Sequence, residues 1–198
     1  MSITNQAIVN AIKNGLNEIH VRHKYDACSH AFEFTISTPS QLKLIKYRIL
    51  AGHNDFVVLA SSPLGVDPDD KEGMARVSEF ICRANERMKA GNFEVSFLTG
   101  EIYFKIFVDC ANIIPSTAMI QNAVTFPLAM FTSHGIGFIS LLVSHAQAEE
   151  ALDKVKEGET EALLALLGRK GKDVLAGLAD IQSDDDDMDV YHPKGMMA

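Results

Sequence analysis

The sequence predicts an α+β fold built from an antiparallel sheet and long helices. The main observation is the stretch from Asp69 to Asp109, where one long amphipathic helical segment runs directly into a tight β-hairpin. Two more observations complete the prediction: one helical stripe and three strand-like runs precede this stretch, and a long apolar segment with helical spacing follows it. The expected order of elements is α-β-β-β-α-β-β-α.

The elements before residue 61 follow from hydrophobic periodicity. Residues 3–19 place apolar side chains at steps of three and four, which predicts an amphipathic helix, and residues 20–29 then form a polar connector. Residues 32–36 alternate apolar and polar side chains, as a half-buried strand does. Residues 42–50 suit a strand or a helix, and we favour the strand. Residues 56–60 form a short apolar strand, which completes a three-stranded meander.

The central helix has recognisable start and stop signals. A loop over residues 61–70 leads into it and ends in three aspartates and a proline, which are favoured where free backbone N–H groups and the helix dipole attract negative charge. Apolar residues then recur at helical spacing up to Met88. Gly91 is expected to end the helix in a left-handed conformation.

The hairpin that follows has a predicted register. A two-residue loop at Thr99-Gly100 sets the cross-strand pairs Leu98 with Glu101, Phe97 with Ile102, Val95 with Phe104, and Phe93 with Ile106. One face is then wholly apolar, and Glu94 lies opposite Lys105 on the other face. A one-residue slip would turn the apolar side chains to solvent, so we expect the register to be strongly specified.

The segment after Asp109 predicts a long helix that is bent or interrupted. Pro127 lies inside it and should kink or break it, and residues 134–137 are the weakest part for a helix. From about Asp153 the pattern changes to short helical pieces. The acidic run Asp184–Asp187 repels itself and predicts a disordered tail. We therefore expect one domain over residues 1–152 and an extension over residues 153–198.

Composition limits the class of protein. The 198 residues are 47% hydrophobic, which is enough for one buried core. The net charge of -8 disfavours binding to nucleic acid or to anionic membrane surfaces. The amino terminus lacks the pattern of a secretory signal, and we expect no run long enough to span a bilayer. These observations predict a cytoplasmic protein, in which the three cysteines are reduced.

Residues of the central stretch resemble a known family. Val77-Ser78-Glu79-Phe80, Asn85 near the helix end and the hairpin GNFEVSFLTGEIYFKI resemble the YbjN family, in which a helix carrying an asparagine runs into a hairpin of the form FxLxxxxGxIxF. The segment SHAQAEEAL at residues 144–152 is similar to the closing segment of that family. The order of elements is also that of the class I type III secretion chaperones, whose fold YbjN proteins share.

The resemblance implies a fold and a mode of action. It implies an open, curved antiparallel sheet with helices packed on one side, frequent homodimerisation and, in the chaperone relatives, capture of an extended segment of a partner protein. It carries no catalytic residues, and the extension after Leu152 has no counterpart. The residues expected to build the fold and its interaction surface are Val77, Phe80, Ile81, Asn85, Phe93, Val95, Phe97, Ile102, Phe104 and Ile106.

The densest group of candidate metal ligands lies in the connector. It consists of His20, His23, Asp26, Cys28 and His30, with a His-x2-His spacing that suits zinc or another divalent ion. The alternative interpretation is a solvated connector rich in histidine. We favour this alternative because the last two residues enter a strand, so four ligands would converge only by coincidence.

No catalytic motif emerges from the remaining residues. Cys82 and Cys110 could act as nucleophiles only beside a base and an oxyanion donor pair, and both are better read as packing or inert thiols. The Gly135-Ile136-Gly137 pair lacks the setting of a dinucleotide site and indicates flexibility or close helix packing. The acidic run Asp184–Asp189 lacks the glycine and the terminal glutamate of a calcium loop, and a solvating tail is the better interpretation.

Two functional hypotheses follow. The first is a non-enzymatic binding module without a cofactor, chaperone-like or regulatory, that is a homodimer and holds an extended segment of a partner protein by its sheet edge or by an apolar helix groove. The second is a small-ligand or metal-binding domain that uses the His20–His30 cluster or an apolar pocket beneath Pro127 and Gly135. A regulator of other proteins is not separable from the first hypothesis by sequence.

Overall fold

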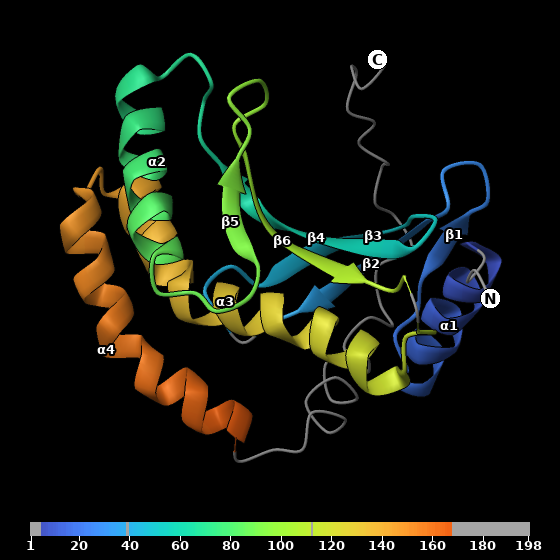
Figure 1. The fold of residues 1–198 in the computed structure, drawn as a ribbon. Helices are drawn as coiled ribbons and strands as arrows, with labels where there is room; N and C mark the ends of the chain where they lie inside the picture. The colour runs from blue at the N-terminus through green and yellow to red at the C-terminus, as the bar shows by residue number, and fades with distance from the viewer. Residues whose placement is uncertain (1–4, 39, 112, 168–198) are drawn as a thin grey trace.

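The structure is a computed structural model that describes residues 5–38, 40–111 and 113–167. It confirms the α+β fold (Figure 1). The elements are α1 (Asn5–Glu18), β1 (Lys24–Asp26), β2 (Ala31–Ser37), β3 (Leu44–Ala51), β4 (Asp55–Gly65), α2 (Lys71–Asn85), β5 (Asn92–Val95), β6 (Glu101–Asp109), α3 (Thr117–Val143) and α4 (Ala148–Leu167).

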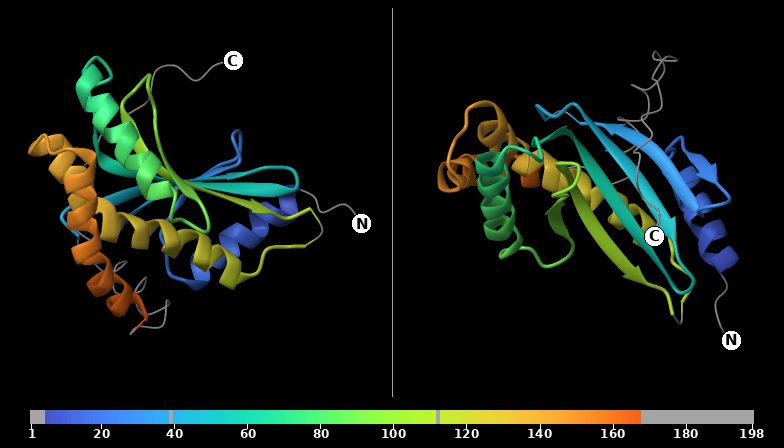
Figure 2. Two further views of the ribbon diagram at one scale, coloured as in Figure 1. Left: turned by 60° about the vertical axis from the view of Figure 1, so that its left-hand side comes forward. Right: turned by 90° about the horizontal axis from the view of Figure 1, so that it is seen from above.

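The six strands form one open, curved antiparallel sheet in the order β1-β2-β3-β4-β6-β5. Helices α1 and α3 lie across one face of this sheet, and α2 stands beside β5 at one end (Figures 1 and 2). The opposite face, which we call the open face, carries the polar side of the alternation. This separation follows from the period of two along each strand, which sends successive side chains to opposite faces.

The core lies between the sheet and α1 and α3. Two cross-strand rows on the inner face show how the register builds it. One row contains Phe32, Ile49, Val58 and Ile106, and the next contains Phe34, Tyr47, Ala60, Phe104 and Phe93. All of these side chains are buried. Each large apolar side chain taken out of water contributes roughly 1.5–3 kcal/mol to the stability of this core. The predicted strands at residues 32–36, 42–50 and 56–60 are confirmed and correspond to β2, β3 and β4.

The polar connector over residues 20–29 contains a strand that the sequence did not indicate. Lys24–Asp26 form β1, which pairs with the start of β2, and all three residues are exposed. The Asp26 carboxylate builds the turn after it, because Oδ1 accepts the Cys28 N–H at 2.9 Å and Oδ2 accepts the Ser29 hydroxyl at 2.6 Å. A three-residue strand has too little alternation to be recognised from periodicity.

Strand β4 extends further than expected. It continues through residues 61–65, which were predicted as loop, and it pairs with β6 as far as Gly65 opposite Glu101. The ladder shifts register between Ser61 and Gly65, and Pro63 lies inside this irregular part. A proline lacks the N–H that a regular ladder needs, so its presence in the strand is explained by the irregularity.

The predicted register of the β5–β6 hairpin was wrong by two residues. Phe93 lies opposite Phe104 and Val95 opposite Ile102, and four residues, 97–100, form the loop. A two-residue loop would have required Thr99 to adopt a positive φ, which a β-branched residue strongly disfavours. In the observed loop only Gly100 does so, with φ at +71°. An error of two residues preserves the faces, but it leaves Phe97 outside the strand.

Helix α2 ends earlier than its glycine signal suggested. Its last residue is Asn85, and Gly91, with φ at +66°, lies at the entry to β5 instead of capping the helix. The predicted start is confirmed, since the Asp70 side chain accepts the Gly73 N–H at 2.9 Å.

Helix α3 is continuous from Thr117 to Val143, so the predicted break at Pro127 or at residues 134–137 was wrong in its position. The segment is interrupted later, between Val143 and the start of α4 at Ala148. Pro127 lies inside the helix and is buried. The glycines of residues 135–137 serve close packing: a Cβ atom on Gly137 would lie 2.5 Å from the Phe80 ring. Tight contacts with neighbouring elements thus hold a segment whose local sequence is weak for a helix.

The expectation that no segment is long enough to span a bilayer was also wrong. By length and composition alone, α3 is long and apolar enough to do so, although more than half of its most apolar stretch is buried inside the protein. The core helix of a soluble protein has the same properties, so this is weak evidence for a membrane.

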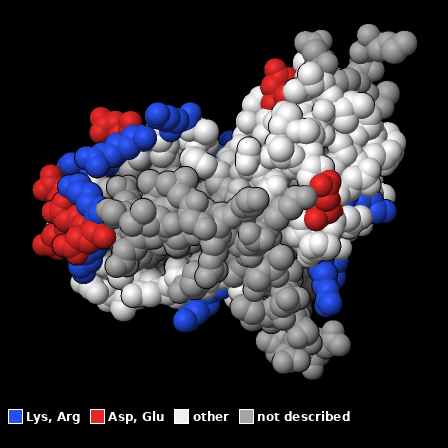
Figure 3. Space-filling view, turned by 90° about the horizontal axis from the view of Figure 1, so that it is seen from below, with Lys and Arg blue, Asp and Glu red and all other residues white. Residues whose placement is uncertain are grey.

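Helix α4 runs through the domain boundary expected after Leu152. Val155 lies beyond that boundary and is buried. Viewed from the helix side, charged side chains gather at the end of the molecule where α2 and α4 lie (Figure 3). There Arg83 of α2 forms ion pairs with Glu79 at 2.7 Å and with Glu149 of α4 at 3.4 Å. The rest of the predicted extension, including Asp184–Asp189, lies outside the described residues.

Candidate functional site

The residues singled out from the central stretch fall into three groups. Seven are buried and build the core: Val77, Phe80, Ile81, Phe93, Ile102, Phe104 and Ile106. Asn85 and Val95 are partly exposed at the edge of the sheet. Phe97 is 71% exposed in the hairpin loop. The structure therefore separates the fold-forming residues of this segment from those that face outward.

An aromatic cluster fixes β5 onto the core. The Phe93 ring lies 4.9 Å from that of Phe104, 5.2 Å from that of Phe131 and 5.1 Å from that of Phe138, measured between ring centroids. The imidazole of His134, which is buried in α3, lies 5.3 Å from the same ring. Edge-to-face contacts of this kind add to the burial energy, so β5 is held rigidly although it is the last strand.

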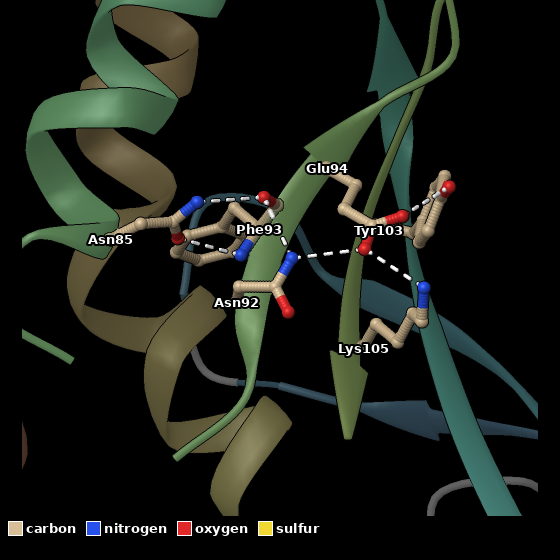
Figure 4. Close-up of polar contacts among 6 residues, drawn as sticks. All are labelled: Asn85, Asn92, Phe93, Glu94, Tyr103 and Lys105. Atoms are coloured by element: carbon tan, nitrogen blue, oxygen red, sulfur yellow. Dashed lines mark hydrogen bonds and ion pairs between the residues drawn. The ribbon is translucent and has the colours of Figure 1, made fainter. Parts of the chain in front are cut away.

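Asn85 closes the outer edge of β5 with its side chain. Its Nδ2 donates to the Phe93 carbonyl at 2.9 Å, and its Oδ1 accepts the Phe93 N–H at 2.8 Å (Figure 4). These are the two bonds that a neighbouring strand would make with Phe93. The asparagine amide thus takes the place of one residue of a seventh strand.

The next outward position on β5 is Val95. Along an antiparallel edge strand, the main-chain N–H and C=O groups of alternate residues bond to the neighbouring strand, and those of the residues between them point outward. The main-chain groups of Phe93 and Val95 both point outward. Ser96 bonds inward again, donating its N–H to the Glu101 carbonyl at 2.9 Å. Within the described part of the chain, the Val95 N–H and C=O have no hydrogen-bond partner. The main chain of this edge is therefore satisfied at Phe93 and unpaired at Val95, and α2 runs beside the strand on its outer side (Figure 1).

A polar network lies on the open face of the same strand. Glu94 accepts hydrogen bonds from the Tyr103 hydroxyl at 2.7 Å, from Lys105 Nζ at 3.0 Å and from Asn92 Nδ2 at 3.0 Å (Figure 4). The predicted pair of Glu94 and Lys105 thus forms, but diagonally, since Tyr103 lies directly opposite Glu94. The sequence missed the tyrosine because the register was displaced by two.

This network shifts two pKa values in opposite directions. Burial by itself would raise the pKa of Glu94, but the hydrogen bonds from Tyr103, Asn92 and Lys105 outweigh it and lower the pKa below its ordinary value. Burial and the bond to the Glu94 carboxylate raise the pKa of Tyr103 to about 12. At neutral pH the site therefore holds a carboxylate at Glu94 and a phenol at Tyr103, which can accept and donate hydrogen bonds to polar groups.

The histidine-rich connector does not converge on a metal site. His23 Nδ1 lies 3.0 Å from the Val21 carbonyl, and His30 Nδ1 lies 3.0 Å from the Tyr25 hydroxyl. His20 and Cys28 are exposed. Within residues 5–38, 40–111 and 113–167, no three His, Cys, Asp or Glu side chains come together to hold a metal ion.

The remaining candidates are accounted for by packing or exposure. Cys82 is exposed on α2, and Cys110 is buried with its pKa raised by burial and by Asp109 and Asp55. A raised pKa keeps the thiol protonated, which is unfavourable for a nucleophile. Beside Gly135, where an apolar pocket was considered, Leu42 fills the space: a Cβ there would lie 3.1 Å from its Cδ1 atom.

Comparison of the chain with protein-family models, with curated proteins and with solved structures gave no match in any of the three.

Proposed function

We propose that the protein is a non-enzymatic binding module that holds an extended segment of a partner protein at the outer edge of β5, with a chaperone-like or regulatory role. The proposal joins the resemblance to the YbjN family and the class I type III secretion chaperones with the geometry of this edge. From the same resemblance we propose a cytoplasmic homodimer.

The half-closed edge of β5 is the observation that supports the proposal most strongly. An extended partner adds to a sheet through main-chain hydrogen bonds to outward-pointing groups, and Val95 offers such a pair. The side chain of Asn85 occupies the next pair, at Phe93. Asn85 belongs to α2, which runs beside β5, so movement of this helix away from the strand would lengthen the available edge, while the aromatic cluster holds the strand itself in place.

The groups beside the edge suit recognition of a peptide. Glu94 lies on the open face of β5 next to Val95, and the Tyr103 hydroxyl and Lys105 Nζ on β6 hold its carboxylate in place. Side chains alternate along an extended peptide, so Glu94 would face one side chain of a segment bound beside β5.

A proline substitution tests this use of the edge. Val95→Pro removes the outward N–H and no ladder hydrogen bond, and proline is tolerated on an edge strand when its nitrogen faces solvent. Val95→Thr is the matched control, because it keeps the N–H and the β-branched shape. Both variants serve as bait beside the wild-type chain in affinity capture from native extract, followed by mass spectrometry.

We expect a partner that wild type and Val95→Thr capture equally and that Val95→Pro loses by at least tenfold. Retention of the same partner by Val95→Pro would place binding elsewhere on the molecule. Absence of any partner from all three baits would count against the function itself.

A further inference from the structure

The loop between β5 and β6 presents two large apolar side chains to solvent. Phe97 is 71% exposed and Leu98 is 78% exposed, the highest values among the large apolar side chains that the structure describes. We call residues 96–101 the tip. Adjacent side chains this large and this exposed indicate a contact surface when the backbone that carries them is fixed.

The tip is built to be rigid. The Gly100 N–H donates to the Ser96 carbonyl at 2.7 Å, and the Thr99 N–H donates to the Ser96 hydroxyl at 3.1 Å. The loop before α2 packs against it, with the Val66 N–H donating to the Gly100 carbonyl at 3.0 Å. Phe97 and Leu98 are therefore pre-organised, which lowers the entropy cost of burying them in a contact.

Carboxylates surround the tip. Asp67, Asp69 and Asp70 lie on the loop that is bonded to Gly100, and Glu101 ends the tip itself; all four are exposed. None of the four forms an ion pair with another described residue. A surface that is apolar at its centre and acidic at its rim fits an apolar patch flanked by lysine or arginine.

The open face of the sheet carries such a patch. Leu50, Val57 and Phe107 lie in one cross-strand row, and Phe107 is 62% exposed. The next row contains Arg48, Leu59 and Lys105, and Lys46 lies in the row beyond it. Glu33 and Glu94 pair with Arg48 and Lys105, whereas Lys46 forms no ion pair with another described residue.

We propose that two copies of this chain pack open face to open face, so that Phe97 and Leu98 of each copy cover Leu50, Val57 and Phe107 of the other. This inference rests on the proposed homodimer and names its surfaces. The tip points away from α3, toward the side of the open face (Figures 1 and 2). A two-fold axis that crosses the middle of β6 at right angles to the strand would place the tip of one copy over the Phe107 end of β6 in the other copy. The distance along β6 from Glu101, next to the tip, to Phe107 is about 20 Å.

The test is the oligomeric state of the full chain, measured by sedimentation equilibrium over a range of protein concentrations. The variants are the tip pair Phe97→Ser with Leu98→Ser, and the face variant Phe107→Ser. The matched control is Ile113→Ser with Ile114→Ser, because these side chains are also 51% and 61% exposed but lie in the loop after β6. Circular dichroism establishes that each variant is folded.

We expect the wild-type chain to be a dimer. Its dissociation constant should rise at least tenfold in the tip variant and in the face variant, and should stay unchanged in the control variant. The dissociation constant of the wild-type dimer should also rise when salt is added. A mixture of the tip and face variants should dimerise more tightly than either alone, since one of its two contacts is wild type. A monomeric wild type would overturn both the dimer and its surfaces. A dimer that the tip and face variants leave intact, or that the control weakens equally, would overturn the surfaces and keep the dimer.

Discussion

The two edges of the sheet are closed in different ways. At one edge, β1 is three residues long, fully exposed and ends in a turn held by the Asp26 carboxylate. At the other edge, β5 is fixed by buried aromatic rings, and its outward main chain is satisfied at Phe93 by the Asn85 side chain. Short, charged edge strands are a common protection against unwanted strand pairing.

The difference indicates which edge suits a regulated contact. The cover of the β5 edge is the Asn85 amide together with α2, which carries it, and both can move away while β5 stays paired with β6. The β5 edge therefore combines a rigid strand with a removable cover. The predictions below contrast the two edges, from the largest expected effect to the smallest.

Phe93→Ala should be the most damaging change, costing about 3–5 kcal/mol of unfolding free energy, because it leaves a cavity inside the aromatic cluster under β5. At the other edge, Tyr25→Ala should cost about 1 kcal/mol or less, because Tyr25 is 37% exposed and loses only its ring contact with Phe32 and an exposed hydrogen bond with His30. Urea denaturation of the two variants measures both values. Equal costs would mean that β5 is held no more firmly than β1.

Asn85→Ala should cost about 1–3 kcal/mol, since it removes the partner of the Phe93 N–H and the shorter of the two hydrogen bonds to the Phe93 carbonyl, leaving the one from Asn92 Nδ2 at 3.4 Å. Asn85→Asp is the informative second variant: it keeps the acceptor for the Phe93 N–H but places an anion beside the Phe93 carbonyl. We expect it to fall between wild type and alanine in the same denaturation assay. A wild-type stability for Asn85→Ala would show that the amide contributes nothing to this edge.

Glu94→Gln should lower stability by about 0.5–1 kcal/mol near neutral pH, since Glu94 is 30% exposed and solvent screens its charge. The pKa of Glu94 is lowered in the folded protein, so its contribution is present above the pKa of the unfolded chain. It is lost as the pH falls through the lower, folded value. The difference between wild type and variant should therefore shrink in acid, which thermal unfolding across a pH series would detect.

The smallest expected effect concerns Asp26, whose carboxyl group should have a pKa below the ordinary value of an aspartate. The Ser29 hydroxyl and the Cys28 N–H lower the pKa of this exposed carboxyl. A pH titration followed by NMR measures it, and Ser29→Ala should move the pKa back toward its ordinary value. No movement in that variant would mean that the turn of the β1 edge does not depend on this contact.

Alternation in the sequence predicted faces better than it predicted pairing. Phe93 and Val95 were assigned to the correct side of their strand, but their partners were displaced by two residues, because a shift of two leaves every side chain on its face. The deciding residue was Thr99, whose reluctance to adopt positive φ lengthens the loop. Turn chemistry, read together with periodicity, would have given the register.

Long-range contacts explain the other differences. Pro127 and Gly137 are local signals against a helix, yet α3 is continuous, because contacts with α2 and α4 require a small residue where Phe80 and Val155 approach. The role of Asn85 was equally hidden: sequence placed it near the end of a helix, but only the fold brings its amide to Phe93.

Hydrogen exchange at single amides of β5 tests the central claim most directly. In the wild-type protein we expect the Phe93 amide to be protected and the Val95 amide to exchange quickly, with Val58 of the central strand β4 reporting global unfolding. In Asn85→Ala, Phe93 should exchange as fast as Val95 while Val58 stays protected. If Phe93 remained as protected as Val58 in that variant, the Asn85 side chain would not be the cover of this edge.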